Sequence, residues 1–270
     1  MLSKRRLGRR IKKLRISARM SLDEAAEKLD KTRSSLSRIE NGLTRADVHL
    51  VRSMMDVYDC RDDWLIELAR RASRKGWWLT FGITDKGYIG METEAADALT
   101  WQLAYIPGLL QTEAYMRELF STGPRWSKEQ FENHVKARMF RQERLVDPDQ
   151  PLRLTAIVDE SVLTRPIGGA EVMRAQLNRL VEFGGLATVS LQVLPHGPKP
   201  HSGMDGAFTI LRFEEAEDPD LLYLEPVTGS IHSEEPEEVR AARLVFDRLR
   251  SEALSPDESV AFIGRMAAQL

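Results

Sequence analysis

Residues 21–42 read SLDEAAEKLDKTRSSLSRIENG, two short helical patterns separated by a tight turn. Ser21 and the glutamate three positions later have the spacing of a capping box, in which each side chain bonds a backbone N–H of the first turn. Thr32 suits the N-cap of the second helix, where only Leu36 and Ile39 are large apolar residues. The stretch therefore predicts a helix-turn-helix whose second helix buries one narrow stripe.

The part of this stretch that reads AAEKLDKTRSSLSRIENG resembles the helix-turn-helix of the XRE family, to which the phage repressors and Cro proteins belong. The resemblance implies that the helix from Thr32 to Glu40 is a recognition helix in the major groove, where arginine can bond bidentately to guanine. The implied contacts to DNA bases come from Thr32, Arg33, Ser34, Ser37 and Arg38. Contacts to phosphate are expected from Arg10, Lys13, Ser21, Lys31, Asn41, Thr44 and Arg45.

Two positions depart from the family pattern. Leu22 stands where many members carry a glutamine that bonds the DNA backbone, so only its main-chain N–H can take that role. Asp30 replaces the usual glycine of the turn, and aspartate tolerates a left-handed backbone better than most residues. The alternative to a DNA-binding unit is a helical hairpin that uses the same caps for packing alone.

The net charge of −2 hides an asymmetry along the chain. Residues 1–75 hold 20 Lys and Arg against 11 Asp and Glu, a net charge of +9, whereas the remaining residues hold 19 against 30, a net charge of −11. Nine of the first nineteen residues are basic and none is acidic. A positive unit of this kind suits phosphate binding, although a solvated helix face has a similar composition.

Helical spacing extends on both sides of the motif. Leu7, Ile11 and Leu14 predict a first helix, residues 48–58 a fourth, and Asp62 the cap of a fifth. The sequence thus predicts an all-α, five-helix DNA-binding domain over residues 1–75, followed by a connecting segment over residues 76–90 and a second domain over residues 91–270.

The second domain combines helical and strand patterns, so the expected fold class is α+β, with a small sheet and flanking helices. Helices are predicted over residues 93–105, 113–120, 128–146, 169–183, 236–253 and 256–268, and strands over residues 152–158, 188–194, 207–213 and 221–225. The helix between the first two strands makes them a parallel β-α-β pair, and the last two strands can pair antiparallel across the polar loop 214–220.

Several motifs of the second domain resemble the C-terminal domain of the WhiJ-like regulators of actinomycetes, which are XRE-type proteins. These motifs are IPGLLQT at 106–112, RMFRQ at 138–142, DESVL at 159–163, Gln176-Leu177 and Val193-Leu194-Pro195. The resemblance implies an antitoxin-like transcription factor that works with a small acidic partner protein. Because one recognition helix reads only a few base pairs, and motifs of this type usually pair two-fold, we expect a homodimer on a pseudo-palindromic operator of double-stranded DNA.

The second domain has no specific catalytic, cofactor or metal-binding signature, so we expect no cofactor, no metal and no enzyme activity. His196, Lys199 and His201 lie in the loop HGPKPHSGMDG and form a possible ligand site, although such a loop is more often a surface connection. Asp159 and Glu160 follow a predicted strand, where carboxylates can be catalytic or can cap a helix. The alternatives to a regulator are a DNA-targeted hydrolase with its site at this loop and an antitoxin that acts mainly through protein binding.

The remaining composition is that of a globular cytoplasmic protein. Hydrophobic residues make up 42% of the chain, which is enough for sizeable cores. One cysteine, Cys60, excludes an internal disulfide and a multi-cysteine zinc site. With no apolar run long enough for a membrane span, we expect a cytoplasmic protein that associates with the nucleoid when bound to DNA.

Overall fold

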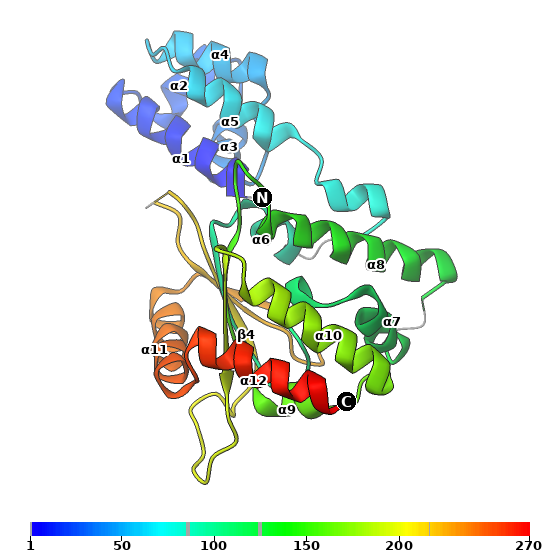
Figure 1. The fold of residues 1–270 in the computed structure, drawn as a ribbon. Helices are drawn as coiled ribbons and strands as arrows, with labels where there is room; N and C mark the ends of the chain where they lie inside the picture. The colour runs from blue at the N-terminus through cyan, green and yellow to red at the C-terminus, as the bar shows by residue number, and fades with distance from the viewer. Residues whose placement is uncertain (1, 85–86, 124–125, 216) are drawn as a thin grey trace. The chain divides into compact units, whose positions relative to one another are not determined.

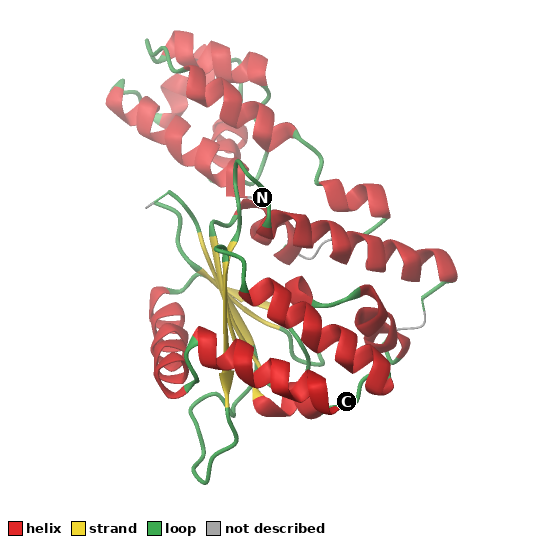
Figure 2. Ribbon diagram, viewed as in Figure 1, coloured by secondary structure: helices red, strands yellow, loops and turns green. Residues whose placement is uncertain are grey.

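The computed structural model describes residues 2–84, 87–123, 126–215 and 217–270. Backbone contacts divide the chain into two compact units, Met1–Trp77 and Trp78–Leu270. The described residues of the first unit form helices only, whereas the second unit contains both helices and a sheet, drawn in yellow in Figure 2. The expected α+β fold class is confirmed.

The N-terminal unit consists of five helices, and the predicted caps are present. The hydroxyl of Ser21 accepts from the N–H of Glu24 in a complete capping box, Thr32 accepts from the N–H of Ser35, and Asp62 caps the last helix. The helices are α1 (Leu2–Ser17), α2 (Leu22–Lys28), α3 (Arg33–Glu40), α4 (Val48–Val57) and α5 (Asp63–Ser73). All five contribute to one apolar core, which includes the two predicted inward residues of α3, Leu36 and Ile39.

The turn between α2 and α3 is made by a left-handed aspartate. Asp30 has φ 51°, and the N–H groups of Asp30 and Lys31 donate to the carbonyls of Glu27 and Ala26. This is the bonding pattern with which a left-handed residue, usually glycine, ends a helix. The turn therefore forms without the glycine that the family pattern carries, as the sequence analysis allowed.

Two glycines of the N-terminal unit permit close approaches that no other residue would. A Cβ on Gly8 of α1 would lie 2.5 Å from the carbonyl oxygen of Ile39 and 2.6 Å from that of Glu40. Gly42 has φ 68°, and a Cβ there would lie 2.8 Å from the Cα of Arg5. Helix α1 is thus held directly against the C-terminal end of α3.

The second unit contains a six-stranded mixed sheet in the order β3-β2-β1-β4-β5-β6. The strands are β1 (Asp97–Gln102), β2 (Arg153–Asp159), β3 (Val189–Leu194), β4 (Phe208–Arg212), β5 (Leu221–Leu224) and β6 (Ile231–Ser233). The predicted parallel pairing of β2 with β3 and antiparallel pairing of β4 with β5 are both confirmed. Strand β6 was not predicted.

The prediction of a helix over residues 93–105 is wrong. The chain forms α6 (Tyr88–Glu94) and then β1, which pairs parallel with β2 and antiparallel with β4 at the centre of the sheet. Ala96, Leu99 and Leu103 have helical spacing, but all four residues from Ala98 to Trp101 are buried, so both faces of this segment are covered. A doubly covered strand shows no alternation of apolar and polar residues, and its sequence is easily taken for a buried helix.

Helices cover both faces of the sheet, as Figure 1 shows. Helix α11 (Pro236–Glu252) packs on one face through Val239, Phe246 and Leu249, and α10 (Gly169–Gly184) and α12 (Pro256–Gln269) lie on the other. The remaining helical elements are η1 (Trp77–Phe81), η2 (Gly108–Leu110), α7 (Glu113–Ser121), α8 (Lys128–Gln142), η3 (Glu143–Leu145) and α9 (Glu160–Thr164). Helix α8 ends four residues earlier than predicted, and α9 was not predicted. Within the described residues, no helix has the length and apolarity that crossing a membrane requires.

Candidate functional site

Helix α3, the predicted recognition helix, presents a polar face to solvent. Leu36, Ile39 and Glu40 are its buried residues, which leaves the five predicted base-contacting positions together on the opposite side. Thr32, Arg33, Ser34 and Arg38 are exposed and Ser37 is half-buried. The hydroxyl of Thr32 accepts from the N–H of Ser35 at 3.1 Å, so this hydroxyl still has its own proton to donate to DNA.

The predicted phosphate-contacting residues are also exposed, and they lie on α1, beside the ends of α2 and α3, and in the loop after α3. The amide of Asn41 donates to the hydroxyl of Ser37 at 3.4 Å, one turn back on α3. The N–H groups of Leu43 and Thr44 both donate to the carbonyl of Arg38, which fixes the start of the loop after α3. The exposed members of this set are Arg10, Lys13, Ser21, Lys31, Asn41, Thr44 and Arg45.

Two of the predicted DNA-contacting arginines have acidic neighbours within the N-terminal unit. Arg10 lies 3.6 Å from the carboxylate of Asp62 and 5.7 Å from the centre of the Trp64 ring. Arg33 lies 3.6 Å from Asp23, and both side chains are about 70% exposed, so solvent screens this pair. Arg33 therefore remains available to a partner with a stronger negative charge.

A buried ion pair that the sequence analysis missed joins α1 to the recognition helix. Arg15 donates to both carboxylate oxygens of Glu40, at 2.6 and 2.9 Å, and also to the carbonyl of Met20 at 2.8 Å. The hydrogen bonds to Glu40 are the main reason that the pKa of Arg15 is raised. Arg15 belongs to the N-terminal basic run, but it serves the core and not the DNA surface.

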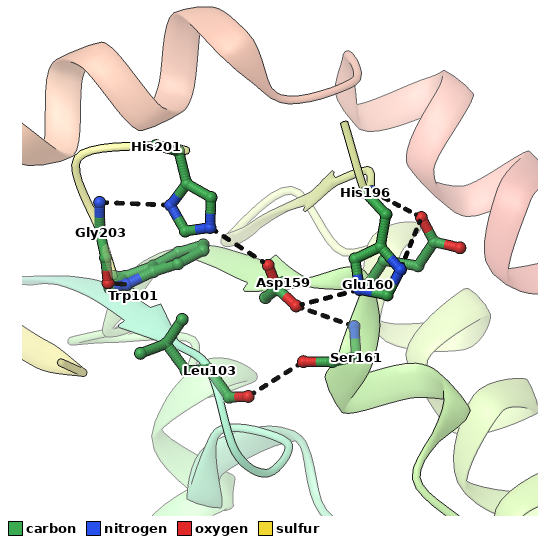
Figure 3. A network of polar contacts seen from close by, with 8 residues as sticks. All are labelled: Trp101, Leu103, Asp159, Glu160, Ser161, His196, His201 and Gly203. Atoms are coloured by element: carbon green, nitrogen blue, oxygen red, sulfur yellow. Dashed lines mark hydrogen bonds and ion pairs between the residues drawn. The ribbon is translucent and has the colours of Figure 1, made fainter. Parts of the chain in front are cut away.

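A polar network joins the possible ligand loop to the carboxyl end of β2 (Figure 3). Asp159 is 8% exposed, and its two oxygens each lie 3.5 Å from the Nε2 atom of a histidine, His196 on one side and His201 on the other. Glu160 accepts from the backbone N–H of His196 at 2.7 Å. The structure thus brings together the two carboxylates and two histidines, whereas Lys199 is exposed on the same loop.

The contacts around this network hold the loop in place. The Nδ1 atom of His201 accepts from the N–H of Gly203 at 3.2 Å, and the indole of Trp101 donates to the carbonyl of Gly203 at 2.8 Å. A Cβ on Gly203 would lie 2.6 Å from the ring of Trp101, so the loop passes close to β1, the strand that carries this tryptophan. The histidine ring meets the tryptophan edge-on, with centroids 5.4 Å apart. The loop is anchored to the central strand by these contacts.

One carboxylate of the network also caps a helix. Asp159 accepts from the N–H of Ser161 at 2.9 Å and so caps α9, which is one of the two roles considered for it from the sequence. The hydroxyl of Ser161 donates to the carbonyl of Leu103, away from either imidazole. No group of three or more His, Cys, Asp or Glu in the described part of the chain is arranged to bind a metal ion.

Two family models match the chain. One is described as a domain of unknown function (DUF5753) and matches residues 86–265, and the other is described as a helix-turn-helix domain and matches residues 6–71. No curated protein and no solved structure matches the chain. The two matches fall on the two units separately, which assigns the helix-turn-helix to the first unit and the uncharacterised domain to the second.

Proposed function

The chain belongs to the DUF5753 family, and because it joins that domain to a helix-turn-helix we propose that it is a sequence-specific DNA-binding transcriptional regulator. The observation that carries this proposal is the helix α3, capped at Thr32 and fixed to α1, which leaves the side chains of Arg33, Ser34 and Arg38 exposed to solvent. In this proposal the helix from Thr32 to Glu40 enters the major groove, and Arg33 and Arg38 read guanines.

The charge distribution supports the same function. The basic N-terminal unit would be attracted to the phosphates, and the acidic second unit would limit non-specific association of the whole chain with DNA. Phosphate contacts from the exposed residues at the ends of α2 and α3 would fix the register of the helix, while base contacts supply specificity.

We assign the second unit a binding role and no catalysis. A homodimer contact, and a small acidic partner protein of the kind that the WhiJ-like resemblance implies, are the two protein ligands that we propose for it. The alternative of a hydrolase with its site near the loop 196–201 is less well supported, because Asp159 caps α9 and lies beside the two imidazoles. An antitoxin that acts mainly through protein binding remains the alternative if the operator contacts fail the next test.

Replacing Arg33 by alanine tests the readout. On the operator, recovered from genomic DNA by its binding to the intact protein, Arg33→Ala should weaken binding by about 1 to 3 kcal/mol, because a bidentate guanine contact is lost. On random DNA of equal length the loss should be much smaller. Fluorescence anisotropy at several salt concentrations measures both.

Two control variants separate base contacts from charge. Lys13→Ala should weaken binding to both DNAs alike and flatten the dependence on salt, because only a phosphate contact is removed. Arg61→Ala removes an exposed arginine outside the predicted interface and should change neither affinity. An equal loss on operator and random DNA for Arg33→Ala would exclude base reading by Arg33.

A further inference from the structure

A cavity of about 610 Å³ lies on the sheet face opposite to α11. Its floor is made by alternate residues of the central strands, Thr100 and Gln102 on β1, Thr209 on β4 and Tyr223 on β5. Their immediate neighbours Trp101, Phe208 and Leu222 belong to the apolar core under α11. The walls come from α6, α8, the turn at 107–109 and the hairpin at 225–230. This volume is in the range of sites for small organic ligands.

The floor carries hydrogen-bonding groups where a sheet under helices usually carries apolar side chains. The hydroxyls of Thr100 and Thr209 lie 3.0 Å apart, and the amide of Gln102 donates to Thr100 at 3.1 Å. The side-chain oxygen Oε1 of Gln102 is buried and has no hydrogen-bond partner among the described residues. An unmatched buried acceptor is costly, and a ligand that donates a hydrogen bond would remove that cost.

Two arginines of α8, one turn apart, line the cavity, and they differ in whether a carboxylate neutralises their charge. Arg141 binds both oxygens of Glu92, each at 2.7 Å, and the attraction of this carboxylate outweighs burial and raises the pKa of Arg141. Arg138 has a neutral hydrogen-bond acceptor, the amide oxygen of Gln111, at 2.9 Å, and its guanidinium lies 4.4 Å from the centre of the Phe120 ring.

Arg138 forms no ion pair with a carboxylate of the described residues. Burial lowers the pKa of Arg138 to about 10, which still leaves the group charged at neutral pH. Glu225, an exposed residue of the hairpin wall, attracts it from a longer distance without forming an ion pair. Only the Nη1 atom of this guanidinium has a hydrogen-bond partner among the described residues, so its Nε and Nη2 donors suit a planar anion.

Aromatic rings also line the cavity. The rings of Tyr88 and Tyr223 are 4.1 Å apart, and those of Trp126 and His134 are stacked at 4.0 Å and 11°. Burial raises the pKa of Tyr223 and lowers that of His134, so the phenol and the imidazole are both uncharged at neutral pH. The lining therefore offers π faces and neutral donors around one unmatched positive charge.

From these observations we propose that the cavity binds a small aromatic organic acid, whose anionic group pairs with Arg138 and whose ring packs among Tyr88, Tyr223 and Trp126. A hydrogen-bond donor on the same molecule bonds the side-chain oxygen Oε1 of Gln102. The role of this ligand as an effector rests on the proposed regulatory function, because one wall of the cavity, α6, is the first α-helix after the junction at Trp77 and Trp78. Binding itself does not depend on that function.

The test uses 1-anilinonaphthalene-8-sulfonate, an aromatic anion whose fluorescence rises in apolar surroundings, titrated onto the full chain without DNA. N-phenyl-1-naphthylamine, its uncharged relative, is the matched probe. Arg138→Gln should raise the Kd of the anion about tenfold or more and leave the Kd of the neutral probe nearly unchanged, because one charged hydrogen-bond pair is lost. Arg138→Lys, which keeps the charge, should fall between, and Arg174→Gln, an exposed arginine of the same unit, should match the unchanged protein.

A second variant locates the site independently of Arg138. Ser230 is a half-exposed lining residue on the hairpin, and Ser230→Trp should weaken binding of both probes by partly filling the cavity. Unchanged binding of the anion in both Arg138→Gln and Ser230→Trp would overturn the proposal. Operator binding is measured separately, without probe, where Arg138→Gln should equal the unchanged protein. Operator binding by Arg33→Ala therefore tests the proposed function. Probe binding by Arg138→Gln and Ser230→Trp tests the cavity, so the two proposals can fail separately.

Discussion

Glu40 is a carboxylate on the helix expected to meet DNA, yet it is only 4% exposed. Its two oxygens are occupied by Arg15, so the charge is neutralised inside the N-terminal unit and does not repel phosphate. The pair also connects α1 to the end of α3. Taking one partner away leaves the other buried and uncompensated, which costs more than the intact pair contributes.

Glu40→Gln should therefore destabilise the N-terminal unit by about 3 to 5 kcal/mol, because the guanidinium of Arg15 keeps its charge in the core. The double variant Arg15→Met with Glu40→Leu should recover most of that loss. Urea unfolding followed by circular dichroism measures both. Glu27→Gln, at an exposed position of α2, is the control and should change stability by less than about 0.5 kcal/mol. Equal unfolding midpoints for Glu40→Gln and this control would contradict the role of the pair.

At the scale of elements, the crossing of α1 over the end of α3 depends on Gly8. Alanine normally stabilises a helix interior relative to glycine by about 1 kcal/mol. Gly8→Ala should do the reverse and destabilise the unit by about 1 to 3 kcal/mol, since the new Cβ meets two backbone carbonyl oxygens that cannot move away cheaply. Gly264→Ala on α12 is the matched control, because a Cβ there lies 4.0 Å from Val181, and it should be neutral or stabilising. Thermal unfolding of the two variants decides the comparison.

The helices of the N-terminal unit could be predicted because their ends are encoded locally. Ser21, Thr32 and Asp62 each cap the helix that their neighbours suggest, within a few residues of sequence. Strand β1 could not be predicted in this way, because its identity depends on pairing with β2 and β4, segments far along the chain. Strand β6 is only three residues long and carries too little pattern to be noticed.

The candidate sites differ in the same respect. The exposed polar residues of α3 follow the spacing of a single helix, so this face could be predicted directly from the sequence. The meeting of Asp159 with His196 and His201 was only partly foreseeable, since the loop and the strand end were noted separately. The cavity could not be predicted, because its lining comes from segments between Ile83 and Ser230 that only the folded chain brings together.

At the scale of the whole molecule, one recognition helix reads too few base pairs to specify a site in a genome. Motifs of this type usually bind as two-fold dimers to half-sites about 34 Å apart. We propose that the contact is made by the second unit, because two strongly positive N-terminal units repel each other before DNA is present.

Cutting the chain at the observed boundary tests this proposal. Light scattering should give twice the chain mass for the full protein and a monomer for the fragment that ends at Trp77. The fragment keeps every predicted base-contacting residue, and yet it should bind the operator at least tenfold more weakly, because the two half-sites are no longer occupied together. A monomeric full-length protein, or a fragment that binds as tightly as the whole chain, would refute the dimer.

The separation of buried from exposed residues on α3 also has a consequence for how new DNA specificities would arise. Only Leu36, Ile39 and Glu40 of this helix are buried, and Arg33, Ser34 and Arg38 are exposed, so substitutions at these three exposed positions meet little packing constraint. If α3 reads bases as proposed, duplicated genes can exchange Arg33, Ser34 and Arg38 and acquire different operators on one scaffold. The same freedom gives protein engineers a place to randomise, provided that Glu40 and its arginine are left intact.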